Sequence, residues 1–212
     1  GLVWTVHDIH NHKKRFQRTE QAVYETLFAF SDEVVTKCDA AGQILENQYL
    51  LANKEEFQVI QDGNYRDKYP DETTKTEARE TLSVDEKSFV FLFFGLIKKY
   101  KGVDLLIEEF QQLDIPDAEL WVVGNPTEDG LENKLREKSN NYTDITLRLE
   151  FIPNEDVQNY MNMADVLVLP FRKILNSGSV YLGLTFGLPI ITPRMGCIPA
   201  TVPEENMELM YD

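Results

Sequence analysis

Three lysines fall within four residues, shortly after a glycine that ends an apolar run. The run at residues 88–94 (SFVFLFF) has the apolar content of a strand buried on both faces, and residues 95–102 (GLIKKYKG) follow it. Apolar residues at helical spacing begin immediately afterwards, at residues 103–110. Gly95 lets the backbone turn closely, and a helix start beside cations attracts anions. The pattern predicts a phosphate-binding loop, and a solvated basic loop is the alternative interpretation. The candidate cations are Lys98, Lys99 and Lys101.

A second candidate loop follows the predicted strand at residues 166–169 and opens a helix with the sequence NSGS. Backbone N–H groups and hydroxyls at such a helix start can hold phosphate oxygens. Alternatively, Ser177 or Ser179 serves only as an N-cap, and both interpretations can hold at once. Gly124, after the predicted strand at residues 119–123, fits a donor site or an ordinary tight turn equally well. The residues of the NSGS segment are Asn176, Ser177, Gly178 and Ser179.

All three histidines of the chain, His7, His10 and His12, lie near its start. A cluster of three histidines without a defined acidic fourth ligand is a weak metal signal, and we expect no metal site. His7 follows a predicted strand and stands beside Asp8. It is a candidate catalytic or sugar-binding imidazole, or else a histidine that caps a helix or borders the core.

Four basic residues follow the histidines and form a compact patch: Lys13, Lys14, Arg15 and Arg18. Such a patch can contact phosphate, an acceptor or an anionic lipid surface. The alternative interpretation is the solvated start of a helix.

Strand and helix patterns alternate along the chain, which indicates βαβ units and doubly wound parallel sheets. A polar segment at residues 64–76 contains Pro70 and predicts a linker between a small first domain at residues 1–63 and a fuller one at residues 77–212. Ligands of such sheets bind beyond the carboxyl ends of the strands, where the candidate loops lie. The predicted strands are residues 2–6, 33–36, 57–60, 88–94, 119–123, 146–151, 166–169 and 189–192, and the predicted helices are residues 16–30, 40–51, 103–110, 130–138, 154–163 and 179–186.

The composition limits the classes of partner. The chain has 212 residues and a formal net charge of −15, which argues against a nucleic-acid binder because duplex binding relies on basic residues. Ten of its 21 basic residues nevertheless lie in or beside loops predicted to face one cleft, among them Arg172, Lys173 and Arg194. A small anionic ligand therefore remains compatible with the acidic surface.

Cysteine content and leader patterns bear on the compartment. Cys38 and Cys197 are too few for a disulfide framework or a four-cysteine zinc site, which fits a reducing, cytoplasmic setting. Residues 174–193 carry no charge, but polar residues and prolines interrupt them, so we expect a loop, a helix and a strand there instead of a membrane span. We expect no signal peptide, and the missing initial Met suggests a piece of a longer protein.

These residues together resemble the GT4 family of glycosyltransferases with the GT-B fold. Residues 95–102 resemble the family's G-R-L-x-x-x-K-G segment, and residues 164–170 (ADVLVLP) resemble its A-D-V-x-V-L-P strand. Residues 187–191 (GLPII) are similar to the family's G-x-P-V-I, residues 59–65 (VIQDGNY) to its interdomain V-I-P-N-G segment, and residues 3–8 (VWTVHD) to its N-domain strand ending in His. The resemblance covers nearly the whole chain in the right order. It implies two Rossmann-like domains, of which the N-terminal one is incomplete.

The resemblance implies retaining, metal-independent transfer of a sugar from a GDP- or UDP-linked donor, without a cofactor, to a glycan or lipid-linked acceptor in surface polysaccharide biosynthesis. Lys101 would hold the diphosphate in a cleft between the domains, with Lys98 and Lys99 nearby. Backbone N–H groups at residues 177–179 would contact the distal phosphate or the sugar, and His7 would approach the sugar. Cations at the leaving diphosphate favour the transition state because negative charge develops there. The location that the resemblance implies is the cytoplasm or the inner face of the membrane.

The sequence departs from the family pattern at three positions. Leu96 replaces an arginine, and Ile174 and Leu182 replace two glutamates that are associated with the sugar and the ribose. Lys98 is a candidate substitute for the arginine, and Asn176 or Ser177 for the first glutamate. A divergent GT4 enzyme is the preferred interpretation. A non-catalytic nucleotide-sugar-binding protein and another GT-B enzyme, such as a sugar-nucleotide epimerase, are the alternatives.

Overall fold

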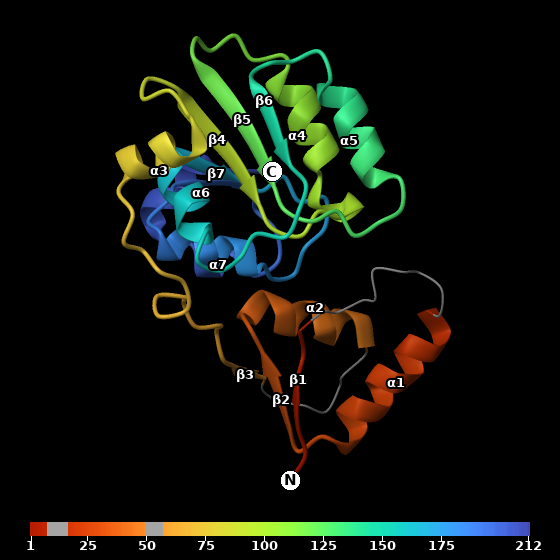
Figure 1. The fold of residues 1–212 in the computed structure, drawn as a ribbon. Helices are drawn as coiled ribbons and strands as arrows, with labels where there is room; N and C mark the ends of the chain where they lie inside the picture. The colour runs from red at the N-terminus through yellow and green to blue at the C-terminus, as the bar shows by residue number, and fades with distance from the viewer. Residues whose placement is uncertain (8–16, 50–56) are drawn as a thin grey trace. The chain divides into compact units, whose positions relative to one another are not determined.

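The computed structural model describes residues 1–7, 17–49 and 57–212, and they form an α/β protein with parallel sheets, as the sequence predicts (Figure 1). The chain divides into two compact units. Unit 1 comprises Gly1–Gly63, Ile174–Ser177 and Met195–Thr201, and unit 2 comprises Asn64–Lys173, Gly178–Arg194 and Val202–Asp212. Two later segments of the chain therefore belong to unit 1. The predicted domain boundaries stay a prediction, since close contact within a unit does not establish that it folds independently.

Unit 1 contains a three-stranded parallel sheet in the order β1-β2-β3. Its apolar core is a cluster that includes Val6, Phe28, Val34 and Leu45, against which Trp4 packs edge-on to Phe28 with ring centroids 4.7 Å apart. The elements of this unit are β1 (Val3–Thr5), α1 (Gln17–Phe30), β2 (Glu33–Thr36), α2 (Asp39–Tyr49), β3 (Gln58–Val59) and α8 (Ile198–Thr201).

A disulfide joins Cys38 to Cys197 within the apolar cluster of unit 1. The two residues are 159 positions apart in sequence, and both are almost fully buried. Cys197 also donates its backbone N–H to the carbonyl of Leu175 at 2.7 Å, so both returning segments of the chain are bound to this unit. One disulfide is not a framework, but the sequence interpretation had not paired these cysteines. The reducing setting stays a prediction.

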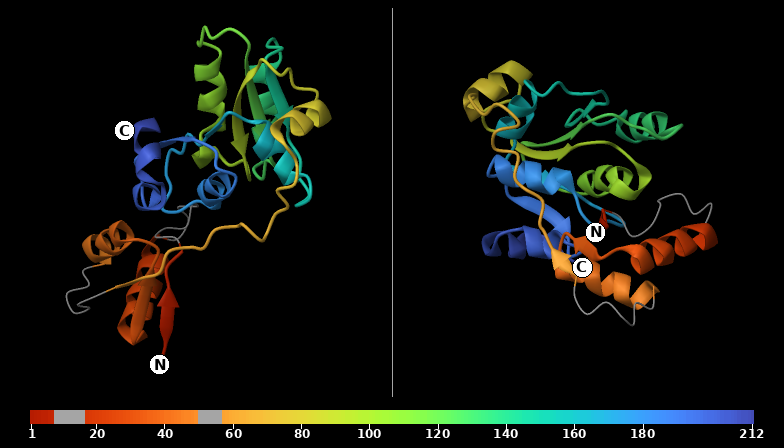
Figure 2. Two further views of the ribbon diagram at one scale, coloured as in Figure 1. Left: turned by 90° about the vertical axis from the view of Figure 1, so that its left-hand side faces the viewer. Right: turned by 90° about the horizontal axis from the view of Figure 1, so that it is seen from below.

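Unit 2 is built on a six-stranded parallel sheet in the order β6-β5-β4-β7-β8-β9. Helices α4 and α5 lie on one face of this sheet, and α3 and α6 lie on the other (Figures 1 and 2). The strands are β4 (Phe89–Phe94), β5 (Ala118–Val123), β6 (Ile145–Arg148), β7 (Val166–Val168), β8 (Ile190–Pro193) and β9 (Met210–Tyr211). The helices are α3 (Lys75–Leu82), α4 (Val103–Phe110), α5 (Leu131–Ser139), α6 (Val157–Met163) and α7 (Gly178–Thr185), with 3-10 turns η2 (Lys99–Lys101) and η3 (Glu204–Leu209).

The central strands are apolar along their length because helices cover both faces of the sheet. Val90, Leu92 and Phe93 of β4 are completely buried, as expected for a parallel strand with helices on both sides. The order also places β4 between β5 and β7. The chain runs from β4 outward to β6 on one side and then continues from β7 on the other, so the sheet has its switch point between β4 and β7.

Several predicted elements need correction. Helix α3 is absent from the predicted helices: it begins at Lys75 behind a capping box of Thr74 and Glu77, so its first two residues overlap the predicted linker at residues 64–76. The predicted strand at residues 146–151 ends at Arg148, and the predicted helix at residues 154–163 begins only at Val157. The uncharged region at residues 174–193 contains a loop, α7 and β8, as predicted. Within the described residues, no helix has both the length and the apolar character needed to cross a membrane.

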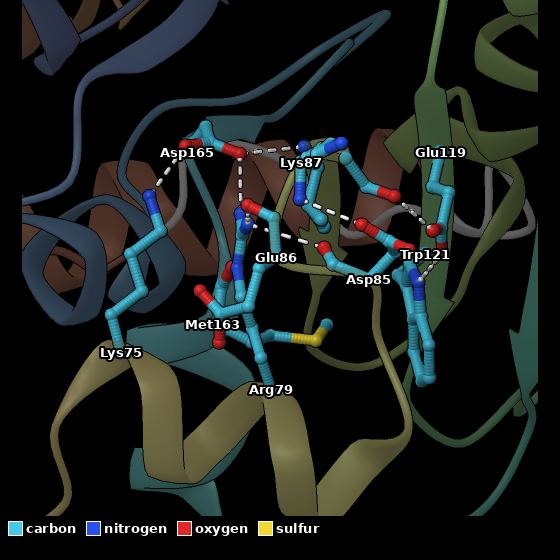
Figure 3. A network of polar contacts seen from close by, with 11 residues as sticks. Lys75, Arg79, Asp85, Glu86, Lys87, Glu119, Trp121, Met163 and Asp165 are labelled. Atoms are coloured by element: carbon cyan, nitrogen blue, oxygen red, sulfur yellow. Dashed lines mark hydrogen bonds and ion pairs between the residues drawn. The ribbon is translucent and has the colours of Figure 1, made fainter.

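A buried ion network fixes the amino ends of the central strands (Figure 3). The Arg79 guanidinium, with 2% of the residue exposed, pairs with Asp165 at 2.9 Å and donates to the carbonyls of Met163 and Glu86. The Val90 amide donates to the same carboxylate at 2.7 Å. Burial alone would raise the pKa of Asp165, but hydrogen bonds from the Lys75 ammonium and the Val90 amide, together with the charges of Lys75 and Arg79, hold it below its ordinary value. Asp165 therefore anchors β7 to β4 at the edge opposite the candidate loops.

Candidate functional site

The loops after β4 and β5 meet at the carboxyl edge of the unit 2 sheet. Gly95 and Gly124 both have positive φ, +133° and +140°. A Cβ added to Gly124 would lie 1.9 Å from the Gly95 carbonyl oxygen, and one added to Gly95 would lie 2.7 Å from the Ser179 hydroxyl. Glycine is therefore required sterically at Gly124, whereas at Gly95 the positive φ favours glycine. The structure thus brings three predicted donor-binding positions, Gly95, Gly124 and Ser179, close together at one sheet edge.

Backbone pairing makes these two loops one structure. The Ile97 amide donates to the Asn125 carbonyl at 2.9 Å, and the Thr127 amide donates to the Ile97 carbonyl at 3.1 Å. Ile97 itself is completely buried. The start of the lysine segment is therefore fixed by hydrogen bonds to the loop after β5.

Lys101 is a buried cation at the end of η2. Only 7% of the residue is exposed, and its Nζ lies 4.8 Å from the centroid of the Phe171 ring and 5.9 Å from that of Tyr100. Burial, and secondarily the positive charge of Lys98, lower the pKa of Lys101 to about 8. In the described part of the chain no carboxylate forms an ion pair with it. The ammonium, still mostly protonated at pH 7, can thus take an anion from outside the protein.

The other two lysines of the segment are placed differently. Lys98 is partly buried, with its Nζ 6.0 Å from the centroid of the Tyr100 ring. Lys99 is exposed, and its backbone amide donates to the Glu128 carboxylate at 3.3 Å. The aromatic residues Tyr100 and Phe171 had no predicted role. A search for aromatic residues beside the lysines could have found Tyr100, but Phe171 is distant in sequence.

The NSGS segment crosses from unit 1 to unit 2, and its residues are described within their own units. In unit 1, Asn176 donates its amide to Asp62 and accepts from the Ser177 backbone N–H at 2.9 Å. The Ser177 hydroxyl is buried and makes no hydrogen bond to any described residue. Ser177 directly precedes α7, but its hydroxyl makes no capping hydrogen bond to a described residue, and Ser179 lies inside α7 instead of at its cap.

The first turn of α7 is close to a tyrosine that the sequence interpretation missed. A Cβ added to Gly178 would lie 3.0 Å from the Tyr65 hydroxyl oxygen. The backbone N–H of Tyr65 donates to the Thr185 hydroxyl at 3.1 Å, at the other end of the same helix. Tyr65 therefore lies along α7, with its hydroxyl near the exposed amide end, where an anion would be favoured.

The remaining predicted residues are in unit 1 or outside the described ranges. His7 is exposed and lies two residues beyond the end of β1. Arg18 belongs to α1. Five predicted residues lie outside the described residues: His10, His12, Lys13, Lys14 and Arg15. Within the described ranges, no group of three or more histidine, cysteine or acidic side chains could hold a metal ion.

The three departures from the family pattern have different environments. Leu96 is 53% exposed, and Ile174 is partly buried. Leu182 is only 6% exposed and belongs to the packed side of α7. An aliphatic side chain at these positions cannot form the hydrogen bonds of an arginine or a glutamate.

The chain matches one protein family and is similar to several known proteins. Residues 88–212, more than half of the 212 residues, match the family model described as Glycosyl transferases group 1. The chain is 28% identical, over 102 residues, to a GDP-mannose:glycolipid 4-beta-D-mannosyltransferase of Xanthomonas campestris pv. campestris, covering 48% of this chain and 29% of that protein. It is 26% identical, over 193 residues, to a D-inositol 3-phosphate glycosyltransferase of Corynebacterium urealyticum, covering 86% of this chain and 45% of that protein.

The fold is similar to that of Anabaena Alr3699/HepE in its complexes with UDP-glucose and with UDP. The TM-scores are 0.74 and 0.80 at 20% and 18% identity, and each comparison covers 96% of this chain and 56% of that one. This likeness shows the fold alone. The chain spans less than half the length of the two curated relatives and a little over half of this solved structure.

Proposed function

The chain belongs to the family of group 1 glycosyl transferases and has their GT-B type of fold, and we propose that unit 2 binds the nucleotide-diphosphate sugar of a glycosyltransferase. The observation that carries this proposal is Lys101, a buried ammonium without a carboxylate partner among the described residues, at the carboxyl edge of the sheet. It lies in the part of the chain that matches the family model. A diphosphate is the small anion that would pair with it.

The chemistry follows from where negative charge develops. When the bond between the sugar and the diphosphate breaks, the leaving diphosphate gains charge, and a fixed cation stabilises it more than it stabilises the intact donor. Lys101 would supply this charge, with Lys98 nearby. The Ser179 hydroxyl and the first N–H groups of α7 would bind the distal phosphate or the sugar. Transfer would proceed with retention, and His7 of unit 1 is kept as a candidate catalytic residue.

The donor base, the acceptor and the location are further parts of the proposal. The printed names of relatives mention GDP-mannose with a glycolipid in Xanthomonas and UDP-glucose in Anabaena, which supports a GDP- or UDP-linked donor without choosing between them. A glycan or lipid-linked acceptor in surface polysaccharide biosynthesis agrees with the first of these names. The basic patch of Lys13, Lys14, Arg15 and Arg18 would face that acceptor or an anionic membrane on the cytoplasmic side.

A second candidate function is a non-catalytic nucleotide-sugar-binding protein. The observation that favours it is the buried aliphatic side chain of Leu182, which cannot hydrogen-bond a ribose hydroxyl. A transfer assay with UDP- and GDP-sugars and a hydrolysis assay distinguish the two functions, because a binder retains affinity for the donor but releases no nucleotide.

Calorimetric titration with UDP and GDP tests the proposed phosphate site. We expect Lys101→Ala to weaken binding of the preferred nucleotide by about tenfold or more, the size of one lost charge-assisted contact. Lys87→Ala is the matched control, because Lys87 is also a lysine of unit 2 but precedes β4 at the opposite edge of the sheet. Unchanged affinity in the folded Lys101→Ala variant would show that the diphosphate site is wrongly assigned.

A further inference from the structure

The loop after β7 packs directly against the lysine segment. Gly102 has φ +72°, and a Cβ there would lie 2.0 Å from the Pro170 carbonyl oxygen. The Arg172 backbone N–H donates to the Tyr100 carbonyl at 2.8 Å. The two loops therefore touch through their backbones on the side of β4 that faces β7.

The Arg172 side chain adds two diverging contacts to this backbone bond. Its Nη1 donates to the Lys99 carbonyl at 3.1 Å, and its Nη2 pairs with Asp104 Oδ1 at 3.0 Å. Arg172 thus binds residues on both sides of Lys101, while the preceding residue, Phe171, supplies the ring over which the Lys101 ammonium lies. A planar guanidinium can make both contacts at once, whereas the single ammonium of a lysine cannot reproduce this fork.

Asp104 connects this arrangement to the next helix. The residue is 7% exposed, and its second carboxylate oxygen accepts from Lys134 of α5 at 2.6 Å. Burial alone would raise the pKa of Asp104, but the hydrogen bonds and charges of Lys134 and Arg172 hold it below its ordinary value. Asp104 is therefore an anion at neutral pH, and it neutralises much of the charge that Arg172 could offer to a ligand.

We propose that Arg172 is a positioning residue for the donor diphosphate: it ties the carbonyl of Lys99 to the carboxylate of Asp104 and so holds Lys101 against Phe171. This inference rests on the proposed function of Lys101. It differs from the expectation that Arg172 is one of the cations facing the ligand, because both ends of its guanidinium are already engaged.

A double-mutant cycle separates the two roles of Arg172. We expect Arg172→Ala to weaken nucleoside diphosphate binding by roughly tenfold in the otherwise unchanged chain, within the range for residues coupled in one network. In the Lys101→Ala background the same substitution has little further effect, because the ammonium that it positions is gone. Additive losses in the two backgrounds would overturn the proposal and indicate a direct phosphate contact by Arg172.

Asp104→Asn gives an independent test with opposite expectations. Positioning predicts weaker binding, because the amide cannot hold Arg172 by an ion pair. A direct phosphate contact predicts tighter binding, because Arg172 is released and a nearby negative charge is removed. Arg136→Ala is the matched control for Arg172→Ala, since Arg136 also pairs with a carboxylate, Glu132 at 2.9 Å, and is exposed to a similar extent as Arg172. Thermal melting of every variant distinguishes a loss of binding from a loss of fold.

The pH dependence of binding provides a readout that a merely structural role would not change. In the unchanged chain, affinity falls as the pH rises through about 8, because Lys101 loses its proton. Loosening the loop in Arg172→Ala lets water reach the ammonium, so this fall moves toward the ordinary lysine value of 10.5. Arg172→Lys does not restore the original profile. An unchanged profile in Arg172→Ala contradicts the proposal, whereas a failure of Lys101→Ala to weaken binding contradicts the proposed function itself.

Discussion

Unit 1 and unit 2 keep their folds by different means. Among its described residues, unit 1 has three short strands and a small apolar cluster, and a disulfide joins segments that are 159 residues apart. Unit 2 has six strands, completely buried central residues and an ion network beneath them. A small core buries too little apolar surface to order a long chain by itself, so a cross-link contributes more there. The larger sheet instead provides a rigid edge on which loops can position the ammonium of Lys101.

The largest expected effect is in unit 2, at the buried ion network. Asp165→Ala removes the partner of Arg79, which is 2% exposed, and so leaves a buried charge uncompensated. Breaking such a pair costs roughly 3–5 kcal/mol of the free energy of unfolding. Hydrogen exchange should show the loss at the amides of β4 and β7 and little change in β2. Equal loss in β2 would mean that the two units unfold together and would break the comparison.

The disulfide of unit 1 is the counterpart of that network. Cys38→Ser together with Cys197→Ser should destabilise unit 1 by roughly 2–4 kcal/mol, mainly because the unfolded chain regains its freedom. We expect faster hydrogen exchange in β2 and α2, with unit 2 unchanged. Dithiothreitol should have the same effect on the unchanged chain and none on the double variant. A loss confined to unit 2 would show that the cross-link does not stabilise unit 1.

The sequence predicted the sheet of unit 2 well because its signal is local. The run that became β4 is apolar throughout, and Lys101 follows it at a spacing that places the cation at the strand's carboxyl end. Helix α3 was missed, although Thr74 and Glu77 form a capping box that local reading could have used. The disulfide and the approach of Phe171 to Lys101 were not predictable in this way. They depend on segments that only the folded sheet brings together.

Two glycines, one in each unit, allow the comparison to be made at single backbone positions. A Cβ on Gly124 would meet the Gly95 carbonyl at 1.9 Å, and one on Gly196 would meet the Leu175 carbonyl at 2.4 Å. Both residues have positive φ, so alanine adds backbone strain of roughly 1–3 kcal/mol at either site, and the collision with a backbone carbonyl adds to that cost. Gly124→Ala should weaken nucleotide binding by displacing the loops that carry Gly95, whereas Gly196→Ala should lower the stability of unit 1.

The matched control for both variants is Gly130→Ala, because Gly130 has φ +73° and nothing within 4 Å of an added Cβ. It has the cost of a left-handed φ without the collision, so the excess of Gly124→Ala over Gly130→Ala measures the packing of the loops together with the higher cost of φ +140°. Calorimetry with the preferred nucleotide and thermal melting of all three variants give the two readouts. If Gly124→Ala and Gly130→Ala changed binding equally, backbone strain alone would account for the loss, and close loop packing would not be needed at the site. If Gly124→Ala weakened nucleotide binding more than Gly130→Ala did and left the melting of unit 1 unchanged, the close contact between Gly124 and Gly95 would be needed for binding.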